Sequence, residues 1–220
     1  MFRLIAIGDI HDSLKCFPLL AGPAGEADLV VLTGDLTTSG GEPAARRVLD
    51  AVKRLGRPFV AQVGNMDLDA VDRLLTAEGV NLHRRGRRFG DVGLFGVGGS
   101  NPTPFSTPTE FTEEEIARFL DEGRAEVADA PVQIAVPHMP PHATAVDRVK
   151  SGAHVGSRSV REFLESRRPA LCLTGHIHEA VGSDRVGSTL VLNPGPFASG
   201  RYVDVRVEDH SVSAEIVRLV

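Results

Sequence analysis

The sequence has few cysteines and no long apolar run, and each shortage excludes a class of protein. Only Cys16 and Cys172 occur among 220 residues, and both lie inside apolar segments. We expect two buried thiols rather than a disulfide, which fits a reducing cytoplasm. The longest apolar runs have the length of strands, far below the ~18 residues that a membrane span needs. The sequence therefore predicts no transmembrane segment.

Lysine is also scarce, because Lys15, Lys53 and Lys150 are the only lysines, and 29 acidic residues against 24 basic ones give a formal net charge of -5. This balance argues against a general nucleic-acid binder, although it does not exclude a local basic groove. Met1 is followed at once by an apolar strand-like segment, which leaves no room for a signal peptide. With 42% hydrophobic residues, the chain can bury one sizeable core. We therefore expect a single domain over residues 1–220.

Apolar segments and helical patterns alternate along the first three quarters of the chain. The strands expected there cover residues 2–7, 29–33, 59–63, 132–136 and 171–174. The expected helices cover residues 13–20, 42–55, 68–75, 112–127 and a segment capped by Ser159 and Glu162. Antiparallel strands are expected around a turn at residues 84–88, and over residues 181–186, 190–192, 202–207 and 212–219. This order favours an α/β (α+β) fold of two packed sheets with helices outside.

Metal-binding residue types stand directly after several of these apolar runs. Asp9 and His11 follow residues 2–7, and residues two apart on a strand point to the same side. A carboxylate and an imidazole that converge form half of a transition-metal site. The other runs of this kind are Gly34-Asp35, Gly64-Asn65-Met66-Asp67, Val136-Pro137-His138 and Gly175-His176-Ile177-His178. One such run alone is most often a surface loop, but the ordered series predicts a metalloenzyme.

In this order, the runs resemble those of the calcineurin-like metallophosphoesterase superfamily, especially its small prokaryotic members without added domains. The resemblance extends from residue 9 to Asn193-Pro194-Gly195. It implies a four-layer sandwich, in which two packed mixed β-sheets are flanked by helices. It also implies two adjacent metal ions. The ligands that it assigns are Asp9, His11, Asp35 and His178 for one ion, and Asp35, Asn65, His138 and His176 for the other.

The chemistry of these donors agrees with that implication. Carboxylate, imidazole and amide oxygen suit divalent transition metals, of which Mn is our first expectation, with Fe, Ni, Co or Zn as alternatives. A bridging Asp35 would hold two ions roughly 3.5–4 Å apart, as two-metal phosphate chemistry requires. A hydroxide between the ions would then attack phosphorus in line, with Asn65 and His138 taking part in catalysis as ligands. Because Asn65 is neutral, it adds no charge that repels a phosphate.

The sequence departs from the family pattern at Met66. Many members have a histidine there, which can protonate the leaving oxygen, and methionine cannot do so. The leaving oxygen then departs unprotonated, or it takes its proton from water or from a substitute such as His142 or His154. His142 and His154 are therefore candidates for facing the phosphate. Asp67 is a further candidate for a supporting role.

Other positions allow two interpretations. Asp12 stands where the family usually has glycine, so it is either a partner of the preceding histidine or the cap of the next helix. The arginines of residues 84–88 form either a solvated hairpin or a contact to phosphate or polynucleotide. The loop at residues 101–108 either walls the substrate pocket or only links two elements. We expect His83 and His210 to lie on the surface.

Three functions follow from these observations. The first is a phosphodiesterase acting on small or nucleotide-like diesters, and the second is a phosphomonoesterase of nucleotide or sugar phosphates. The third is a non-catalytic metal-binding scaffold. A small phosphoester is the expected partner, and nucleic acid is not favoured because the overall charge is negative. We expect no membrane partner and a cytoplasmic location, and the sequence indicates no oligomeric state.

Overall fold

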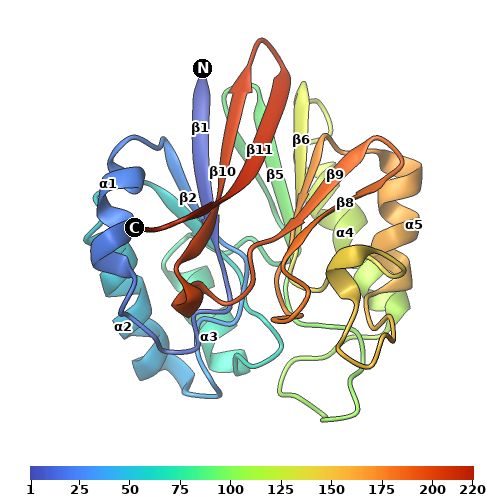
Figure 1. Ribbon diagram of the computed structural model, residues 1–220, viewed down its shortest axis with the longest axis horizontal. Coiled ribbons are helices and arrows are strands. Elements are labelled where there is room, and N and C mark those ends of the chain that lie inside the picture. The colour runs from blue at the N-terminus through green and yellow to red at the C-terminus, as the bar shows by residue number, and fades with distance from the viewer.

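The computed structural model describes residues 1–220 and shows helices, two sheets and further helices as successive layers (Figure 1). The strands are β1 (Phe2–Ile7), β2 (Leu29–Leu32), β3 (Phe59–Ala61), β4 (Gly86–Phe89), β5 (Val92–Val97), β6 (Val132–Pro137), β7 (Leu171–Leu173), β8 (Gly182–Val186), β9 (Thr189–Asn193), β10 (Arg201–Glu208) and β11 (Ser211–Arg218). The helices are α1 (Phe17–Gly25), α2 (Gly41–Lys53), α3 (Asp69–Ala77), α4 (Glu113–Ala125) and α5 (Arg158–Arg167), with 3-10 turns η1 (Ala145–Asp147) and η2 (Phe197–Ser199). The predicted sandwich of two mixed sheets flanked by helices is confirmed.

The two sheets have matching arrangements of parallel strands. One sheet has the order β11-β10-β1-β2-β3, and the other has the order β4-β5-β6-β7-β9-β8. Strands β1, β2 and β3 are parallel, as are β5, β6, β7 and β9, while β10, β11, β4 and β8 pair antiparallel at the sides. The loops that follow the parallel strands therefore gather at one end of the molecule, at the bottom of Figure 1.

Three apolar clusters lie between the four layers. In β1, Ile5 and Ile7 face α1 and α2, whereas Leu4 and Ala6 face the second sheet. This alternation follows from the two-residue period of a strand, and it explains why both faces of β1 are buried. The third cluster lies between the second sheet and helices α4 and α5, and it contains Phe95.

A buried amide joins the two sheets beneath the loops. The Gln62 side chain is fully buried, and its Nε2 donates towards the carbonyl oxygens of Thr33, Val97 and Val136, at 3.1, 3.3 and 2.7 Å. Thr33 follows β2 in the first sheet, while Val97 and Val136 belong to the second. An amide buried in this way is stabilising only while its hydrogen bonds are kept, so it fixes how the sheets face each other.

The first helix begins later than the predicted residues 13–20, because α1 starts at Phe17. The amide of Ser13 donates to the Ile10 carbonyl at 2.9 Å, so the chain turns there before it becomes helical. Pro18 then falls in the first turn of the helix, where its missing N–H costs nothing. Asp12 therefore does not cap this helix.

Two further boundaries differ from the prediction. Residues 84–88 are not a turn, because β4 already begins at Gly86 and the reversal lies at Gly90, where φ is 59°. Helix α5 is capped by Ser157 and not Ser159, since the Ser157 hydroxyl accepts from the Val160 amide at 3.1 Å. The capping box that opens α4 is present as predicted. No helix is both long and apolar enough to cross a membrane.

Candidate metal centre

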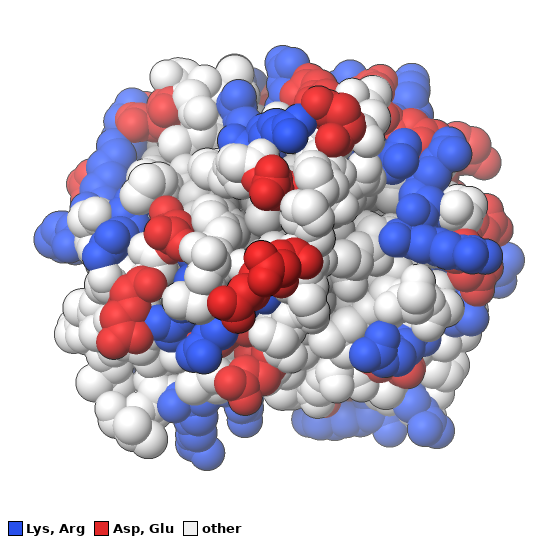
Figure 2. All heavy atoms as spheres, turned by 90° about the horizontal axis from the view of Figure 1, so that it is seen from above, with Lys and Arg blue, Asp and Glu red and all other residues white.

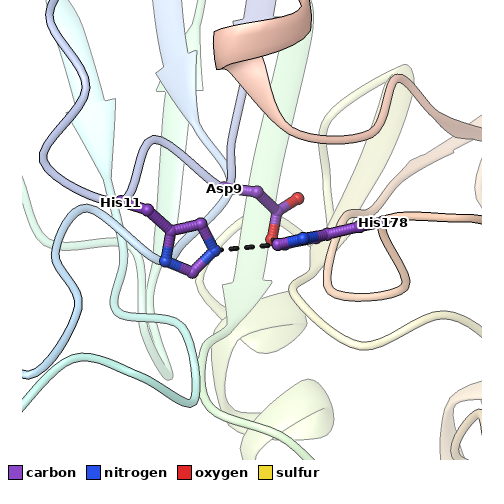
Figure 3. Close-up of side chains that lie close together, drawn as sticks. All are labelled: Asp9, His11 and His178. Carbon is purple, nitrogen blue, oxygen red and sulfur yellow. Dashed lines mark hydrogen bonds and ion pairs between the residues drawn. The ribbon is translucent and has the colours of Figure 1, made fainter.

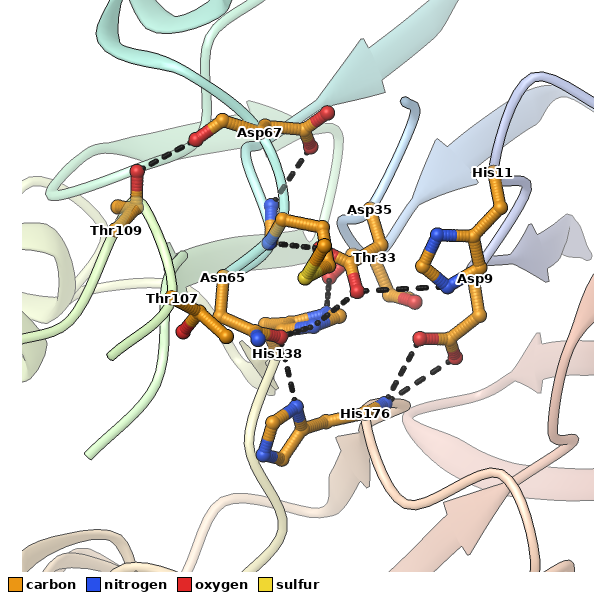
Figure 4. A network of polar contacts seen from close by, with 12 residues as sticks. Asp9, His11, Thr33, Asp35, Asn65, Asp67, Thr107, Thr109, His138 and His176 are labelled. Atoms are coloured by element: carbon orange, nitrogen blue, oxygen red, sulfur yellow. Dashed lines mark hydrogen bonds and ion pairs between the residues drawn. The ribbon is translucent and has the colours of Figure 1, made fainter. Parts of the chain in front are cut away.

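All seven predicted metal ligands lie in loops that follow parallel strands, and the structure brings them together (Figure 3 and Figure 4). Asp9 and His11 follow β1, Asp35 follows β2, Asn65 follows β3, His138 follows β6, and His176 and His178 follow β7. The two last histidines are not on the strand itself, because β7 ends at Leu173. The chain turns between them, so their rings reach different neighbours.

The backbone is strained at several of these positions. Asp9, His11, Asp35 and His176 have φ values of 49°, 46°, 51° and 67°. Residues other than glycine rarely adopt this left-handed conformation, and each such residue costs on the order of 1 kcal/mol. Backbone hydrogen bonds hold the strained loops, since the amides of Ile10 and His11 both donate to the Asp35 carbonyl, at 2.8 and 3.0 Å. Such clustering is typical of a functional site.

The first group of candidate ligands contains Asp9, His11 and His178 (Figure 3). The Nε2 atoms of His11 and His178 are 3.1 Å apart, and His178 Nε2 is 3.4 Å from Asp9 Oδ1. Two nitrogens at about 2.1 Å from one ion, in tetrahedral or octahedral geometry, lie about 3.0–3.4 Å apart. The spacing of this group thus fits ligands of a single ion.

The second group surrounds the side-chain oxygen of Asn65. That oxygen lies 2.8 Å from His176 Nδ1 and 3.3 Å from His138 Nε2 (Figure 4). The other ring nitrogen of His138, Nδ1, donates to the Thr33 carbonyl at 3.0 Å. This bond fixes the ring orientation and leaves Nε2 to bind an ion, which is the usual arrangement around a metal-binding histidine.

Asp35 connects the two groups. Its Oδ2 atom is 3.6 Å from His11 Nε2 and 3.5 Å from His138 Nε2, while Oδ1 accepts the Met66 amide at 2.7 Å. One carboxylate oxygen therefore lies between an imidazole of each group. Asp9 also lies close to both groups, because one ligand atom each of Asp9, Asp35 and His138 lie within 4.8 Å of one another.

The glycines that precede the candidate ligands make room for their neighbours. A Cβ atom on Gly64 would lie 2.1 Å from Asp35 Oδ1, and one on Gly175 would lie 2.4 Å from Asp9 Oδ2. No side chain can occupy those positions without moving the carboxylate. The Gly-ligand pairs seen in the sequence are thus a consequence of close packing between adjacent loops.

The buried charges of this centre favour a cation. Burial alone would raise the pKa of Asp9, but a hydrogen bond to His178 and nearby imidazoles lower it overall. Burial lowers the pKa of His138, but the charge of Asp35 and its hydrogen bond raise it to about 9 overall. Burial and the adjacent His138 lower the pKa of His176 to about 4. The buried carboxylates thus favour a positive charge on the neighbouring His138 ring, and a divalent ion would supply the same compensating charge.

Asp12 acts on the centre through another residue. Its Oδ2 accepts the Thr38 amide at 3.0 Å, and the Thr38 hydroxyl lies 3.3 Å from His11 Nδ1. The other oxygen of Asp12 is 3.7 Å from Arg47. Thr38 is thus the residue that contacts the His11 ring, and no local pattern in the sequence pointed to it.

Asp67 holds loops together instead of facing the substrate. Its fully buried carboxylate accepts from the amides of Leu36, Thr37 and Gly64, at 3.0, 2.8 and 2.9 Å (Figure 4). Burial and the nearby charge of Asp35 raise its pKa to about 7. The carboxylate therefore ties the loop after β2 to the loop after β3, which positions two of the candidate ligands.

A cavity of about 850 Å³ opens beside the centre. Its inner wall includes Asn65, His176 and His178, and its other walls come from loops after β5 and β6. The loop residues that can contact a ligand there are Asn101, Phe105, His142, Lys150 and His154, and the first residues of α4 and α5, Glu113 and Arg158, complete the wall. Phe105 is largely exposed, at 82%. The loop at residues 101–108 therefore forms a wall of this cavity, and His142 and His154 both line it.

The arginines of residues 84–88 are engaged elsewhere. Arg84 binds Glu122 at 3.0 Å, and Arg88 binds Asp129 at 2.6 Å, so carboxylates on or just after α4 neutralise them. Figure 2 shows the face at the top of Figure 1, opposite the loops of the centre, with basic and acidic side chains interspersed. No basic stripe crosses that face.

The prediction for His83 was wrong. Its ring stacks on Phe111 with the centroids 5.3 Å apart, and its Nδ1 accepts the Gly98 amide at 3.0 Å. Burial lowers its pKa to about 4, so it packs as a neutral, half-buried residue against these rings. His210 is exposed, as expected.

Comparisons with known proteins agree with this geometry. Residues 2–180 match the calcineurin-like phosphoesterase family. The uncharacterized protein MJ1162 of Methanocaldococcus jannaschii is 32% identical over 203 residues, which cover 88% of each chain. The crystal structure of TT1561 from Thermus thermophilus has a TM-score of 0.74 at 17% identity, with 99% of each chain covered. The purple acid phosphatase PPD1 from yellow lupin seeds has a TM-score of 0.65 at 12% identity, covering 99% of this chain and 51% of that one.

Proposed function

The chain belongs to the calcineurin-like phosphoesterase family, and from this premise we propose that it is a phosphodiesterase acting on small or nucleotide-like diesters. The family resemblance predicted from the sequence is thus confirmed. Metal-dependent hydrolysis of phosphoesters is the chemistry of the family. The preference for diesters, the identity of the metals and the role of each residue are our proposals.

We propose two ion sites that share Asp35. Asp9, His11 and His178 complete the first, and Asn65, His138 and His176 complete the second. The observation that carries this proposal is the position of Asp35 Oδ2, which is 3.6 Å from His11 and 3.5 Å from His138. The donors are oxygen and imidazole nitrogen without any thiolate, so Mn is the first candidate, and Fe, Co, Ni or Zn also fit.

When bound, the two ions supply Lewis acidity, which offsets charge on the phosphoryl oxygens and makes water nucleophilic near neutral pH. The protein's part is to position them. The Thr33 carbonyl orients the His138 ring, and the Asn65 amide provides an oxygen donor without adding negative charge. The cavity beside the centre then receives the organic arms of the ester.

The walls of that cavity favour a diester. Its volume of about 850 Å³ is much larger than a phosphate group needs, and it is in the range of sites for small organic ligands. Glu113 and Glu179 also line it, and their carboxylates disfavour the second negative charge of a monoester. Lys150 and Arg158 form no ion pair, and their presence keeps a monoester of a nucleotide or sugar as the second candidate. A cytoplasmic location stays a prediction.

The test compares aryl phosphodiesters with aryl phosphomonoesters on Mn-loaded protein of measured metal content. We expect two equivalents of metal and a higher kcat/KM for the diester. In the His138→Ala variant, the second site should weaken while the first keeps its ion. Two bound equivalents without turnover would identify a metal-binding scaffold, and faster monoester turnover would overturn the diester assignment.

A further inference from the structure

The leaving oxygen of a phosphoester needs a proton, and the centre itself has no free group to provide one. The four imidazoles of His11, His138, His176 and His178 are all assigned to ions by the proposed function, on which this inference rests. Met66, next to Asn65, has no acidic proton. Proton donation to a leaving oxygen typically contributes about 10²–10⁴-fold, so its source matters.

A buried carboxylate supports one of the two other histidines of the cavity. Asp147 is fully buried, and its Oδ2 accepts the amides of Ala143 and Gly156, at 3.1 and 3.0 Å. Its Oδ1 accepts the Thr144 amide at 2.9 Å and faces His154 Nδ1 at 2.6 Å. Three backbone donors hold the carboxylate in place, the Thr144 hydroxyl lies 3.5 Å from Oδ1, and the shortest contact is to the imidazole.

That contact determines how His154 presents its ring. Because Nδ1–H donates to Asp147, the ring is anchored, and Nε2 has no partner in the protein. The side chain is 38% exposed and lines the cavity together with His176 and His178. A carboxylate behind an imidazole fixes its tautomer and its orientation, which suits proton transfer at the other nitrogen.

His142 lacks this support. Its Nδ1 is 3.7 Å from Asp147 Oδ2, which is too long for a hydrogen bond. Its ring packs edge-on against His154 with centroids 6.0 Å apart, and it lines the same cavity. His142 therefore serves as a matched control, with the same residue type in the same cavity but without a hydrogen bond to Asp147.

We propose that His154 is a catalytic residue that protonates the leaving oxygen, with Asp147 as its positioning residue. As water oxygen bonds to phosphorus, the bond from phosphorus to the leaving oxygen breaks, and its electron pair stays on that oxygen. The leaving oxygen takes the proton from Nε2 of the His154 imidazolium and departs as an alcohol or phenol. His154 is left neutral, with its remaining proton on Nδ1 and still donated to Asp147 in a hydrogen bond. The proton released by the attacking water returns to solvent, and Nε2 regains one from solvent.

A purely structural role for the pair makes a different prediction. The segment from Pro141 to Ser157 is held by two isolated β-bridges. One joins Pro141 to Ser157, and the other joins Arg148 to His154. If the pair only held this segment, changing His154 would lower stability or slow all substrates equally. Dependence on the leaving group separates the two roles, because only a proton donor helps poor leaving groups more than good ones.

The decisive variant is His154→Asn, whose amide can still donate to Asp147 while it lacks an acidic proton. Metal-loaded wild type and variant are compared on aryl methyl phosphodiesters, from nitrophenol to unsubstituted phenol leaving groups. We expect kcat to fall by about 10²-fold or more for phenol and little for nitrophenol, so that the dependence on leaving-group pKa steepens. His142→Asn should leave that dependence unchanged. An unchanged slope in His154→Asn, or an equal loss for all leaving groups, overturns the proposal.

A second readout does not depend on activity. Nitrogen NMR of the folded protein should show the His154 proton on Nδ1, and Asp147→Asn should abolish this preference. A wild-type ring protonated only at Nε2 would overturn the proposal. Failure of the proposed function is distinguishable, because the wild type would then hydrolyse neither diesters nor monoesters, and both proposals would fall together.

Discussion

Asp35 is the residue on which both proposed ion sites depend, since one of its oxygens lies between His11 and His138. We predict that Asp35→Asn lowers metal content from two equivalents to less than one. Turnover should fall by more than about 100-fold. Substitution of a residue that only supports a metal ligand already lowers metal affinity or activity by about 10- to 100-fold, and Asp35 is proposed as a ligand itself. Elemental analysis of the purified variant measures the loss. Asp121→Asn, at a surface ion pair, is the control, and two full equivalents in Asp35→Asn would contradict the bridge.

A substitution at Gly64 tests whether close packing against the neighbouring loop requires glycine before the candidate ligands. A methyl group there would lie 2.1 Å from Asp35 Oδ1, so Gly64→Ala must displace the carboxylate. We expect a loss of about 1–3 kcal/mol in the free energy of unfolding, together with weaker metal binding. In Gly25→Ala the new methyl meets no atom within 4 Å, and the change should stay within about 0.5 kcal/mol. Urea unfolding and metal titration of both variants check this, and equal effects would disprove the packing argument.

Among the helices, α4 and α5 are joined at their first turns by one side chain. Glu113 of α4 accepts the Ser157 hydroxyl at 2.6 Å and the amides of Arg158 and Ser159, at 3.0 and 2.9 Å. Glu113→Ala should therefore destabilise the protein by about 2 kcal/mol, since it removes charged hydrogen bonds at the N-terminus of α5. Glu114→Ala changes an exposed neighbour and should cost little. Chemical unfolding compares them, and similar losses would show that the capping contact is unimportant.

The loop that walls the cavity has a titratable anchor. Glu110 accepts hydrogen bonds from the hydroxyls and amides of Thr103 and Thr107. Burial raises its pKa, but these bonds lower it from 4.5 to about 2 overall. Because the folded state favours the ionised form, the stabilisation is complete above pH 4.5 and is lost as the pH falls towards about 2. The stability difference between wild type and Glu110→Gln should shrink over this range. A difference independent of pH would refute the anchor.

These elements also show what a sequence can predict. The proximity of the candidate ligands was predictable because each follows an apolar strand, and parallel strands bring such positions to one edge. The start of α1 was not predictable, because Pro18 is tolerated anywhere in the first turn and therefore fits several starting residues. Asp147 and Thr38 carry no local signal, since their importance comes from contacts made only in the folded chain. His83 was misplaced because the aromatic rings that bury it include Phe111, which is distant in sequence.

At the scale of the whole molecule, metal binding should contribute directly to stability. Ions that bind only the folded state raise the free energy of unfolding by about 2.7 kcal/mol per site at 100 times the dissociation constant. For a chain of this length that corresponds to a rise of about 5–10 °C in Tm for each site, and about 10–20 °C for the two sites together. We expect removal of metal with a chelator to lower Tm by this amount and Mn to restore it. Asp35→Asn should show no such response, and an equal response in this variant would contradict the assignment.

The division of the centre between two sheets has a further consequence, for the rates of folding and unfolding. Loops of the first sheet provide Asp9, His11, Asp35 and Asn65, and loops of the second provide His138, His176 and His178. The full set therefore exists only after the sheets have docked around Gln62, which is a late event among contacts so distant in sequence. Ions that bind after this step slow unfolding without speeding folding. The lifetime of the folded chain would then be set by the supply of metal.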